Sequence, residues 1–476
     1  MKNQLLKKIF ASPFKPLYDE ARISYTIRRS LFMMILGNAL GNMSSQATAG
    51  SAFTGYASAL GANDFVFGLL NALPILGALI QLPAAMLIGK TGKRKQYFLA
   101  YGIPSRMLWI LAGFIPYFVP VSPEWLQIWT FIMITTLIAI SGSMINVGFT
   151  PWMGDLVPMQ IRGRFIGLRN RIISALSMVT GIVMAYILDH LGGFSGYTLV
   201  FVLGGILGTL DICCFIFVQD IPVKITKGET FGVMLKTVFT DKRFMKYLTF
   251  WTLWCFSSNL AAPYLIRYAL GPMQLSFIQV TIASQITASL VSIFAMPHWG
   301  RFLDRYGSRS ALLVTSTITS VTFGFWLFAS PGNVLIVFLY HLVGALFWSG
   351  TDLTVSSMLL SYTPADRRTG YVAVQACVTS LFGSFIAILI AGAFLQSTEG
   401  HVSFSLIGIA MDHYKLLFAI AMLLRVLIVI FFVPKIDNDR DASLKDAVRD
   451  AKLWFLRARM AAKQNRLRRK ARKSNP

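Results

Sequence analysis

Residues 300–309 read Gly-Arg-Phe-Leu-Asp-Arg-Tyr-Gly-Ser-Arg, a short charged segment between two long apolar runs. A shorter version, Gly-Lys-Thr-Gly-Lys-Arg, stands at residues 89–94, again between two apolar runs. Gly92 and Gly307 are 215 positions apart. Glycine permits a positive φ and a close approach of helices, and basic side chains suit the headgroup level of a membrane. Each segment therefore predicts a tight turn between two membrane helices.

A second pair of segments repeats at a similar interval. Residues 158–167 read PMQIRGRFIG and residues 364–370 read PADRRTG, and each segment follows an apolar run. Their first prolines are 206 positions apart. Two independent matches at similar offsets indicate that the chain consists of two related halves.

Apolar runs occupy most of the chain on both sides of a basic segment at residues 220–245. About 20 apolar residues in a helix cross the ~30 Å hydrocarbon layer of a bilayer. Six such runs precede the basic segment and six follow it, which predicts an all-α membrane protein with two six-helix bundles, residues 31–219 and 246–434. The twelve runs begin near Leu31, Phe65, Gln96, Trp125, Ile166, Tyr197, Lys246, Gln274, Ser310, Val334, Gly370 and Leu416.

The composition fits this interpretation. Of the 476 residues, 55% are hydrophobic and 13% are charged, and the mean hydropathy is +0.61, which together exclude an ordinary soluble protein. The net charge of +24 does not indicate nucleic-acid binding, because the basic residues lie in alternate loops and at both ends. We expect neither a disulfide nor a structural metal, because all the cysteines lie inside apolar runs. They are Cys213, Cys214, Cys255 and Cys377.

The distribution of charge predicts the topology. With an N-terminus in the cytoplasm, the basic loops all fall inside, as the positive-inside rule requires, and both termini are cytoplasmic. Residues 1–30 show no apolar core followed by a small-residue cleavage site, so we expect an uncleaved N-terminal segment. We expect the basic tail at 435–476 either to lie on the anionic inner leaflet or to be solvated. Loops expected inside hold Lys90, Lys93, Arg94, Lys95, Arg162, Arg164, Arg301, Arg305, Arg309, Arg367 and Arg368; those expected outside hold Asn63, Asp64, Glu124, Glu399, His401 and Asp412.

The turn at residues 300–309 resembles the signature of the major facilitator superfamily. In that family a glycine, an acidic and basic pair, a second glycine and a basic residue stand between helices two and three, and again between helices eight and nine. The PMQIRGR stretch is similar to the family's companion loop after helix four, and the resemblance covers about residues 31–433. It implies a monomeric secondary transporter of the cytoplasmic (inner) membrane, in which two halves rock about a central site.

The resemblance also implies that the turns latch the cytoplasmic ends of the halves together. Gly89 stands where the first copy should have an aspartate, so Asp304 would belong to the more intact copy. Alternatively, the basic residues of these turns only set the topology. The residues implied are Gly89, Lys90, Gly92, Arg94, Asp155, Arg162, Arg164, Gly300, Asp304, Arg305, Gly307, Arg309, Arg367 and Arg368.

Two pairs of ionisable residues lie within apolar runs, where a charge needs a partner or a function. Arg106 and Asp211 fall at similar depths by the 1.5 Å rise of a helix, and we expect them to form a structural ion pair. Asp352 and Arg425 also fall at equal depth. Asp352 could carry a proton for coupled transport, or Arg425 could hold it ionised as a brace or gate.

Polar side chains at membrane depth are the candidates for substrate binding. The first run carries Asn38, Asn42 and Gln46 at four-residue spacing, on one stripe of a helix that the family places against its cavity. The alternative is that these amides bond neighbouring helices, because small residues accompany them. Amides beside indoles suit a neutral or amphipathic organic molecule, and the further candidates are Asn146, Trp254, Asn259, Gln285, His341, Trp348 and Gln375.

Several motifs are missing from the sequence. Without a phosphate-binding GxxxxGK[ST] loop, an HExxH motif or clustered metal ligands, we expect no enzyme activity and no cofactor, and a proton or sodium gradient as the energy source. We also expect no cavity-facing basic residue at mid-depth, which disfavours organic phosphates as cargo. The alternatives are a membrane sensor or scaffold that signals through its tail, and a lipid-modifying membrane enzyme.

Overall fold

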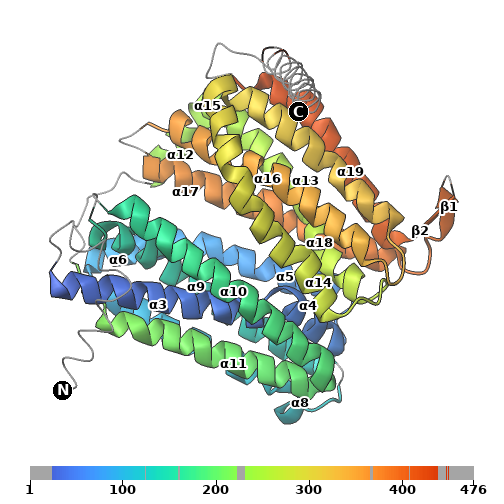
Figure 1. Cartoon of the computed structure of the whole chain (residues 1–476), viewed down its shortest axis with the longest axis horizontal. Coiled ribbons are helices and arrows are strands. Elements are labelled where there is room, and N and C mark those ends of the chain that lie inside the picture. Colours follow the sequence, from blue (N-terminus) through green and yellow to red (C-terminus); the bar gives the residue numbers. More distant parts are fainter. Residues whose placement is uncertain are drawn as a thin grey trace, which may run out of the picture.

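A computed structural model describes residues 24–123, 125–158, 161–221, 231–364, 368–406 and 408–437, together with residues 446 and 449. The helices form two bundles, which lie one above the other in Figure 1. The expected N-terminal segment up to residue 23 lies outside the described residues, as do residues 222–230 of the expected linker and most of the tail.

The N-terminal bundle is a series of long apolar helices, several of them divided by a short irregular turn. Ala49 has an extended backbone and separates the first two helices, and a 3₁₀ turn that contains Pro74 divides the next two. The elements are α3 (Tyr25–Thr48), α4 (Gly50–Ala59), α5 (Asp64–Ala72), η1 (Leu73–Leu76), α6 (Gly77–Thr91), α7 (Arg94–Gly113), α8 (Ile115–Phe118), α9 (Trp125–Leu156), α10 (Arg162–Leu191), α11 (Gly193–Cys214) and η2 (Phe215–Phe217).

The C-terminal bundle has the same plan, with two π-helical turns and a β-hairpin that the hydropathy pattern does not indicate. A short helix in the expected linker precedes it. The elements are α12 (Phe231–Thr240), α13 (Lys242–Leu270), α14 (Phe277–Thr281), η3 (Ile282–Ile286), α15 (Thr287–Thr322), η4 (Phe323–Phe328), α16 (Val334–Tyr362), α17 (Arg368–Val378), η5 (Thr379–Phe385), α18 (Ile386–Thr398), β1 (Phe404–Leu406), β2 (Ile409–Met411), α19 (His413–Phe432) and η6 (Val433–Lys435).

The described helices account for twelve membrane crossings. Eight segments are long and apolar enough to cross a bilayer, and one of them, Phe277–Phe328, contains two helices that meet at Gly307. Three crossings remain. One consists of α3 together with α4, and the other two are α7 and α13; these segments are also long but more polar. The predicted fold class, two six-helix bundles in a membrane, is confirmed.

Both signature turns have the backbone that the sequence predicts. Gly92 ends α6 with φ +68°, and Gly307 has φ +80° between the two halves of α15. A side chain at either position would be strained, because L-residues rarely adopt this region. The two turns therefore reverse the chain sharply between neighbouring helices.

The two bundles share a hydrophobic core at one end of the molecule only. There, Tyr56 and Phe201 of the first bundle belong to the same apolar cluster as Tyr264 and Phe418 of the second. At the other end the two bundles have separate cores. The core of the first bundle surrounds Trp152. The core of the second bundle contains Phe244, Tyr247 and their neighbours.

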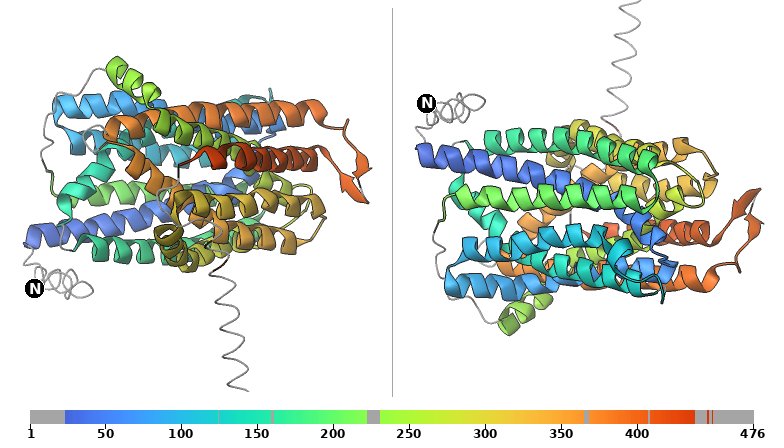
Figure 2. Two further views of the ribbon diagram at one scale, coloured as in Figure 1. Left: turned by 90° about the horizontal axis from the view of Figure 1, so that it is seen from above. Right: turned by 90° about the horizontal axis from the view of Figure 1, so that it is seen from below.

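The ribbons agree with this division. In Figure 1 the bundles converge towards α4, α14 and α18 and diverge towards α6 and α12, and both views in Figure 2 show the long helices running between these two ends. We call the end with the shared core the closed end, and the end with the turns at Gly92 and Gly307 the open end.

Candidate substrate and gating sites

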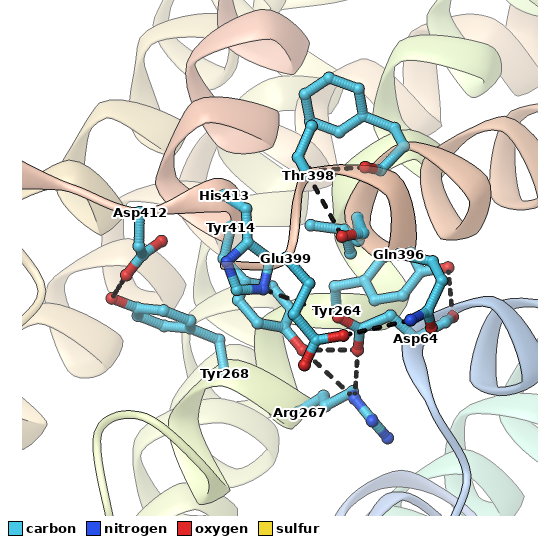
Figure 3. A network of polar contacts seen from close by, with 12 residues as sticks. Asp64, Tyr264, Arg267, Tyr268, Gln396, Thr398, Glu399, Asp412, His413 and Tyr414 are labelled. Atoms are coloured by element: carbon cyan, nitrogen blue, oxygen red, sulfur yellow. Dashed lines mark hydrogen bonds and ion pairs between the residues drawn. The ribbon is translucent and has the colours of Figure 1, made fainter. Parts of the chain in front are cut away.

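A polar cluster joins the two bundles at the closed end, around Asp64 at the start of α5 (Figure 3). Arg267 of α13 donates from Nε to Asp64 Oδ1 at 2.7 Å, and the Tyr414 hydroxyl of α19 donates to the same oxygen at 2.6 Å. His413 Nε2 lies 3.7 Å from the other carboxylate oxygen. Asp64 is only 4% exposed, so this ion pair is screened little by water.

Arg267 makes further contacts across the same boundary. Its Nη2 donates to the Ala62 carbonyl at 2.7 Å and its Nη1 to Ser58 Oγ at 3.1 Å, while the guanidinium lies 4.9 Å from the centre of the Phe67 ring. One side chain of the second bundle therefore binds a carboxylate, a carbonyl, a hydroxyl and an aromatic face of the first.

A second contact between the bundles lies nearby, at the start of α14. Asp189, near the end of α10, accepts hydrogen bonds from the backbone N–H groups of Phe277 at 2.8 Å and Ile278 at 2.9 Å. These are orphan donors of a helix N-terminus, which a carboxylate satisfies well. The closed end is thus held by several charge-assisted hydrogen bonds that would all have to break if the bundles separated there.

A polar cavity of about 210 Å³ lies between the bundles. The first bundle lines it with Asn42 and Gln46 of α3 and with a face of α10 that includes Gly181. The second bundle contributes Thr281 and, from the π-helical turn η3, Gln285. Two of the predicted amides and one from the other half therefore meet at a single site that both bundles share.

The third amide of the α3 stripe has a different environment. Asn38 Oδ1 accepts a hydrogen bond from Arg169 Nη2 of α10 at 3.2 Å, and its amide nitrogen donates to the Met34 carbonyl. Asn38 thus bonds two helices of the same bundle, as the alternative interpretation of the stripe predicts for this position. Asn42 and Gln46 are the members that reach the cavity.

A larger cavity, of about 440 Å³, lies inside the C-terminal bundle among α13, α15, α16 and α19. It brings together four sequence candidates from three helices, and its walls also include Tyr340 and apolar side chains such as Leu265 and Ile266. Trp348 stacks on the buried Trp254 ring with 6.2 Å between centroids. The candidates that line it are Asn259, His341, Trp348 and Arg425.

Arg425 is a buried cation in the wall of this cavity, with 3% of its surface exposed. Its Nη1 donates to the Thr319 carbonyl at 3.1 Å and its Nη2 to Ser258 Oγ at 2.7 Å, whereas its Nε has no hydrogen-bond partner. The guanidinium lies 4.2 Å from the Phe323 ring centre and 5.0 Å from that of Trp254. The expectation of no cavity-facing basic residue is therefore wrong, because α19 is rotated so that Arg425 faces inward.

The possible Asp352–Arg425 ion pair is not present. Asp352 is exposed, and no carboxylate of the described residues lies within ion-pair distance of Arg425. Asp352 instead continues the α16 face that carries His341 and Trp348, one turn beyond the cavity towards the open end. A role in coupling stays a prediction, but not one in which Arg425 holds the carboxylate.

The predicted pair between Arg106 and Asp211 is present. Arg106 Nη2 of α7 lies 3.5 Å from Asp211 Oδ2 of α11, and the Asp211 side chain is 8% exposed. Gly41 of α3 packs directly against the same carboxylate, where a Cβ atom would lie 2.9 Å from the Asp211 Cγ atom. The pair thus joins three helices of one bundle.

The signature turn of the first half forms a brace within its own bundle. Arg94 is buried and donates from Nη1 to Asp155 Oδ2 of α9 at 2.9 Å and from Nη2 to the Ile221 carbonyl at 3.2 Å. Lys95 Nζ binds the carbonyls of Ile216 and Val218 at 2.8 and 2.7 Å, at the end of α11. These two basic residues therefore hold helix ends together in addition to any effect on topology.

The second copy of the turn differs. Asp304 is exposed and makes no hydrogen bond or ion pair to a described residue, and Gly300 lies inside the first part of α15. Of the remaining latch residues, Arg367 and the side chains of Arg162 and Arg368 lie outside what the structure describes. A latch at the open end stays a prediction for this copy.

Two more sequence candidates lie apart from both cavities. Asn146 on α9 is exposed, and Gln375 of α17 bonds weakly, at 3.4 Å, to Thr379 Oγ1 at the start of the adjoining turn η5. Neither lines the two cavities described above.

Comparison with known proteins identifies the family. Residues 32–388 match the family model described as Major Facilitator Superfamily, which is more than half of the chain. The chain belongs to the major facilitator superfamily. Members are transporters, so the chain is a multi-pass membrane transporter and not an enzyme. No curated protein matches the chain significantly.

Solved structures of transporters share the fold of this major facilitator. A point mutant of the nucleoside transporter NupG has 14% identity and a TM-score of 0.66, over 86% of this chain and 100% of that one. A bacterial homologue of the human lysosomal transporter Spinster has 16% identity and a TM-score of 0.64, over 87% and 96%. The xylose transporter XylE from E. coli has 13% identity and a TM-score of 0.62, over 88% and 98%.

Sequence reasoning missed the cluster at the closed end of this major facilitator. Asp64 had been noted only as a residue of an outer loop, and Arg267 not at all. They are 203 positions apart, so no local pattern connects them. One feature of the sequence could have indicated the cluster: Arg267 is a basic residue at the outer end of a membrane helix, where the positive-inside rule expects none.

Proposed function

We propose that this chain is a secondary active transporter of the cytoplasmic membrane that moves a small organic molecule by alternating access, driven by a proton or sodium gradient. The observation that carries this proposal is a polar cavity lined by both bundles, in a molecule whose bundles share a core at one end only. A site at such a boundary changes its exposed side when the two bundles rock.

Under the predicted topology the open end faces the cytoplasm, so the state that we propose for this molecule is inward-open. The open end carries Arg94, Lys95 and Arg301, and basic loops face the cytoplasm. Two of the similar structures are described as inward-facing and inward open, which supports this orientation. The Asp64–Arg267 cluster would then be the external gate.

The polar cavity of about 210 Å³ between the bundles, which we call the central cavity, suits a molecule with neutral polar groups. Asn42, Gln46 and Gln285 each offer an amide that can both donate and accept, and Thr281 adds a hydroxyl. Such groups recognise hydroxyls, amides or the edges of heterocycles without a net charge. The similar structures include transporters of nucleosides and of xylose, which are molecules of this kind.

Transport in proteoliposomes tests the proposal. The purified protein is first screened against small organic molecules by the shift in its melting temperature, and uptake of each stabilising compound is then measured under an imposed pH or sodium gradient. We expect at least one compound to be carried faster with the gradient than without it. If no stabilising compound crosses the membrane under any gradient, the proposal is wrong.

Gly181 offers a matched pair of variants for the central cavity. A Cβ atom at Gly181 would lie 3.4 Å from Gln46 Oε1 and 3.7 Å from Gln285 Oε1, whereas a Cβ at Gly167, also on α10, would have no atom within 4 Å. Gly181→Leu should therefore fill the cavity and reduce uptake at least about tenfold, while Gly167→Leu keeps uptake near wild type. Equal uptake by both variants would show that the cargo binds elsewhere.

A further inference from the structure

The cavity of the C-terminal bundle differs chemically from the central cavity, because it contains a charge that is not neutralised. Arg425 is buried in its wall, and among the described residues its polar partners are a carbonyl and a hydroxyl, not a carboxylate. A guanidinium has five N–H donors, and two hydrogen bonds occupy only part of them. Its Nε–H lies buried with no partner.

A buried cation without a counter-ion is unfavourable, because the loss of its hydration is not offset by an opposite charge. Contacts with the Phe323, Trp254 and Trp348 rings at 4.2–5.6 Å compensate in part. These contacts do not supply an acceptor for the Nε–H group, which has no hydrogen-bond partner. A ligand that brings a negative charge into the cavity would place that charge beside the guanidinium and offset it.

The walls define the rest of the ligand. The cavity holds about 440 Å³, and its lining includes the aromatic residues Trp348 and Tyr340 and the apolar residues Leu265, Ile266 and Ala345. Such walls take an apolar or aromatic body. Arg425 is the sole Arg or Lys among the described lining residues, so one negative charge matches the site, whereas a dianionic phosphate would keep a charge unpaired.

We propose that this cavity binds an organic monocarboxylate with an apolar body about the size of one or two rings, and that Arg425 pairs with its carboxylate. Asn259 and His341 lie in the same walls and offer polar contacts to substituents of the body. The inference depends on the proposed function in one respect, namely that the bound acid is a cargo of the transporter. The binding itself is independent of transport and can be tested without it.

Binding to the purified protein in detergent tests the inference. Dissociation constants are measured for benzoate, phenylacetate and 1-naphthylacetate and for the matching neutral amides, from the ligand-dependent shift in melting temperature. We expect at least one acid to bind at least about tenfold more tightly than its amide, because a hydrogen bond to a charged group is stronger than a neutral one. If no acid binds more tightly than its amide, the inference is wrong.

Arg425 variants show whether this guanidinium causes the preference. Arg425→Gln should reduce the ratio of acid to amide affinity to about one, and Arg425→Lys should leave a smaller preference than wild type, because lysine keeps the charge but loses the planar fork. A preference that survives Arg425→Gln unchanged would overturn the assignment.

Gly344 gives a test that leaves Arg425 in place. Gly344 lines the cavity, and no atom lies within 4 Å of the position that its Cβ would take. Gly344→Leu should therefore occupy the cavity without straining the helix, and weaken the binding of 1-naphthylacetate at least about tenfold. Unchanged binding of this acid would place it outside the cavity. Because binding and uptake are measured separately, an acid that binds but is not transported would show that it is not a cargo and would leave the binding site in place. The proposed function fails only if no stabilising compound at all is transported.

Discussion

At the level of single residues, the buried charges show how far depth along a helix can predict contacts. A rise of 1.5 Å per residue fixes the depth of a side chain, and on this basis Arg106 and Asp211 were expected to pair, as they do. The same reasoning allowed a pair between Asp352 and Arg425, which is absent. Depth leaves the rotation of each helix about its axis open: α19 turns Arg425 into the cavity wall, whereas Asp352 on α16 is exposed one turn beyond that cavity.

The Arg106–Asp211 pair makes a prediction about stability. Arg106→Gln leaves the buried Asp211 carboxylate without its partner and should lower the free energy of unfolding by about 2 kcal/mol. The loss is smaller than for a fully buried pair, because 22% of the Arg106 side chain is exposed. Melting temperatures in detergent measure the effect. Adding Asp211→Asn should recover part of the loss, and a double variant no more stable than the single one would contradict the pair.

At the level of helices and turns, the sequence predicts the long apolar segments well. The predicted starts at Trp125 and Val334 are those of α9 and α16, because each helix begins directly after a polar turn. The π-helical turns η3 and η5 could not be predicted, since an extra residue in a helical turn changes neither composition nor hydropathy. The hairpin of β1 and β2 was missed because two three-residue strands in a loop are too short for a periodic signal.

The contact between α3 and α11 gives a prediction at this level. A Cβ atom at Gly41 would overlap the Asp211 carboxylate, so Gly41→Ala should force the two helices apart and lower stability by about 1–3 kcal/mol. Gly89 in α6 is the matched control, because nothing lies within 4 Å of its Cβ position. Gly89→Ala should leave stability unchanged or raise it by up to about 1 kcal/mol through helix propensity. Equal melting temperatures for both variants would show that α3 and α11 do not pack closely.

At the level of the whole molecule, the repeated turns predicted the division into two bundles. They did not predict which end of the molecule is closed. Internal repeats show that the halves are related, whereas the contacts between the halves depend on residues far apart in sequence, such as Asp64 and Arg267. The two states of a rocking transporter also have the same sequence and the same helices. Only the positions of the shared core and of the polar cluster show which end is closed.

The central claim is that the closed end and the open end alternate. Pulsed electron resonance measures the distance between spin labels at each end in a variant without native cysteines, with labels on Ser195 and Ser330 at the closed end and on Lys93 and Arg301 at the open end. All four residues are exposed. Arg267→Gln removes the hydrogen bonds to Asp64, Ala62 and Ser58 and should favour separation at the closed end. We expect the closed-end distance to lengthen and the open-end distance to shorten together. A longer closed-end distance with an unchanged open-end distance would contradict alternating access.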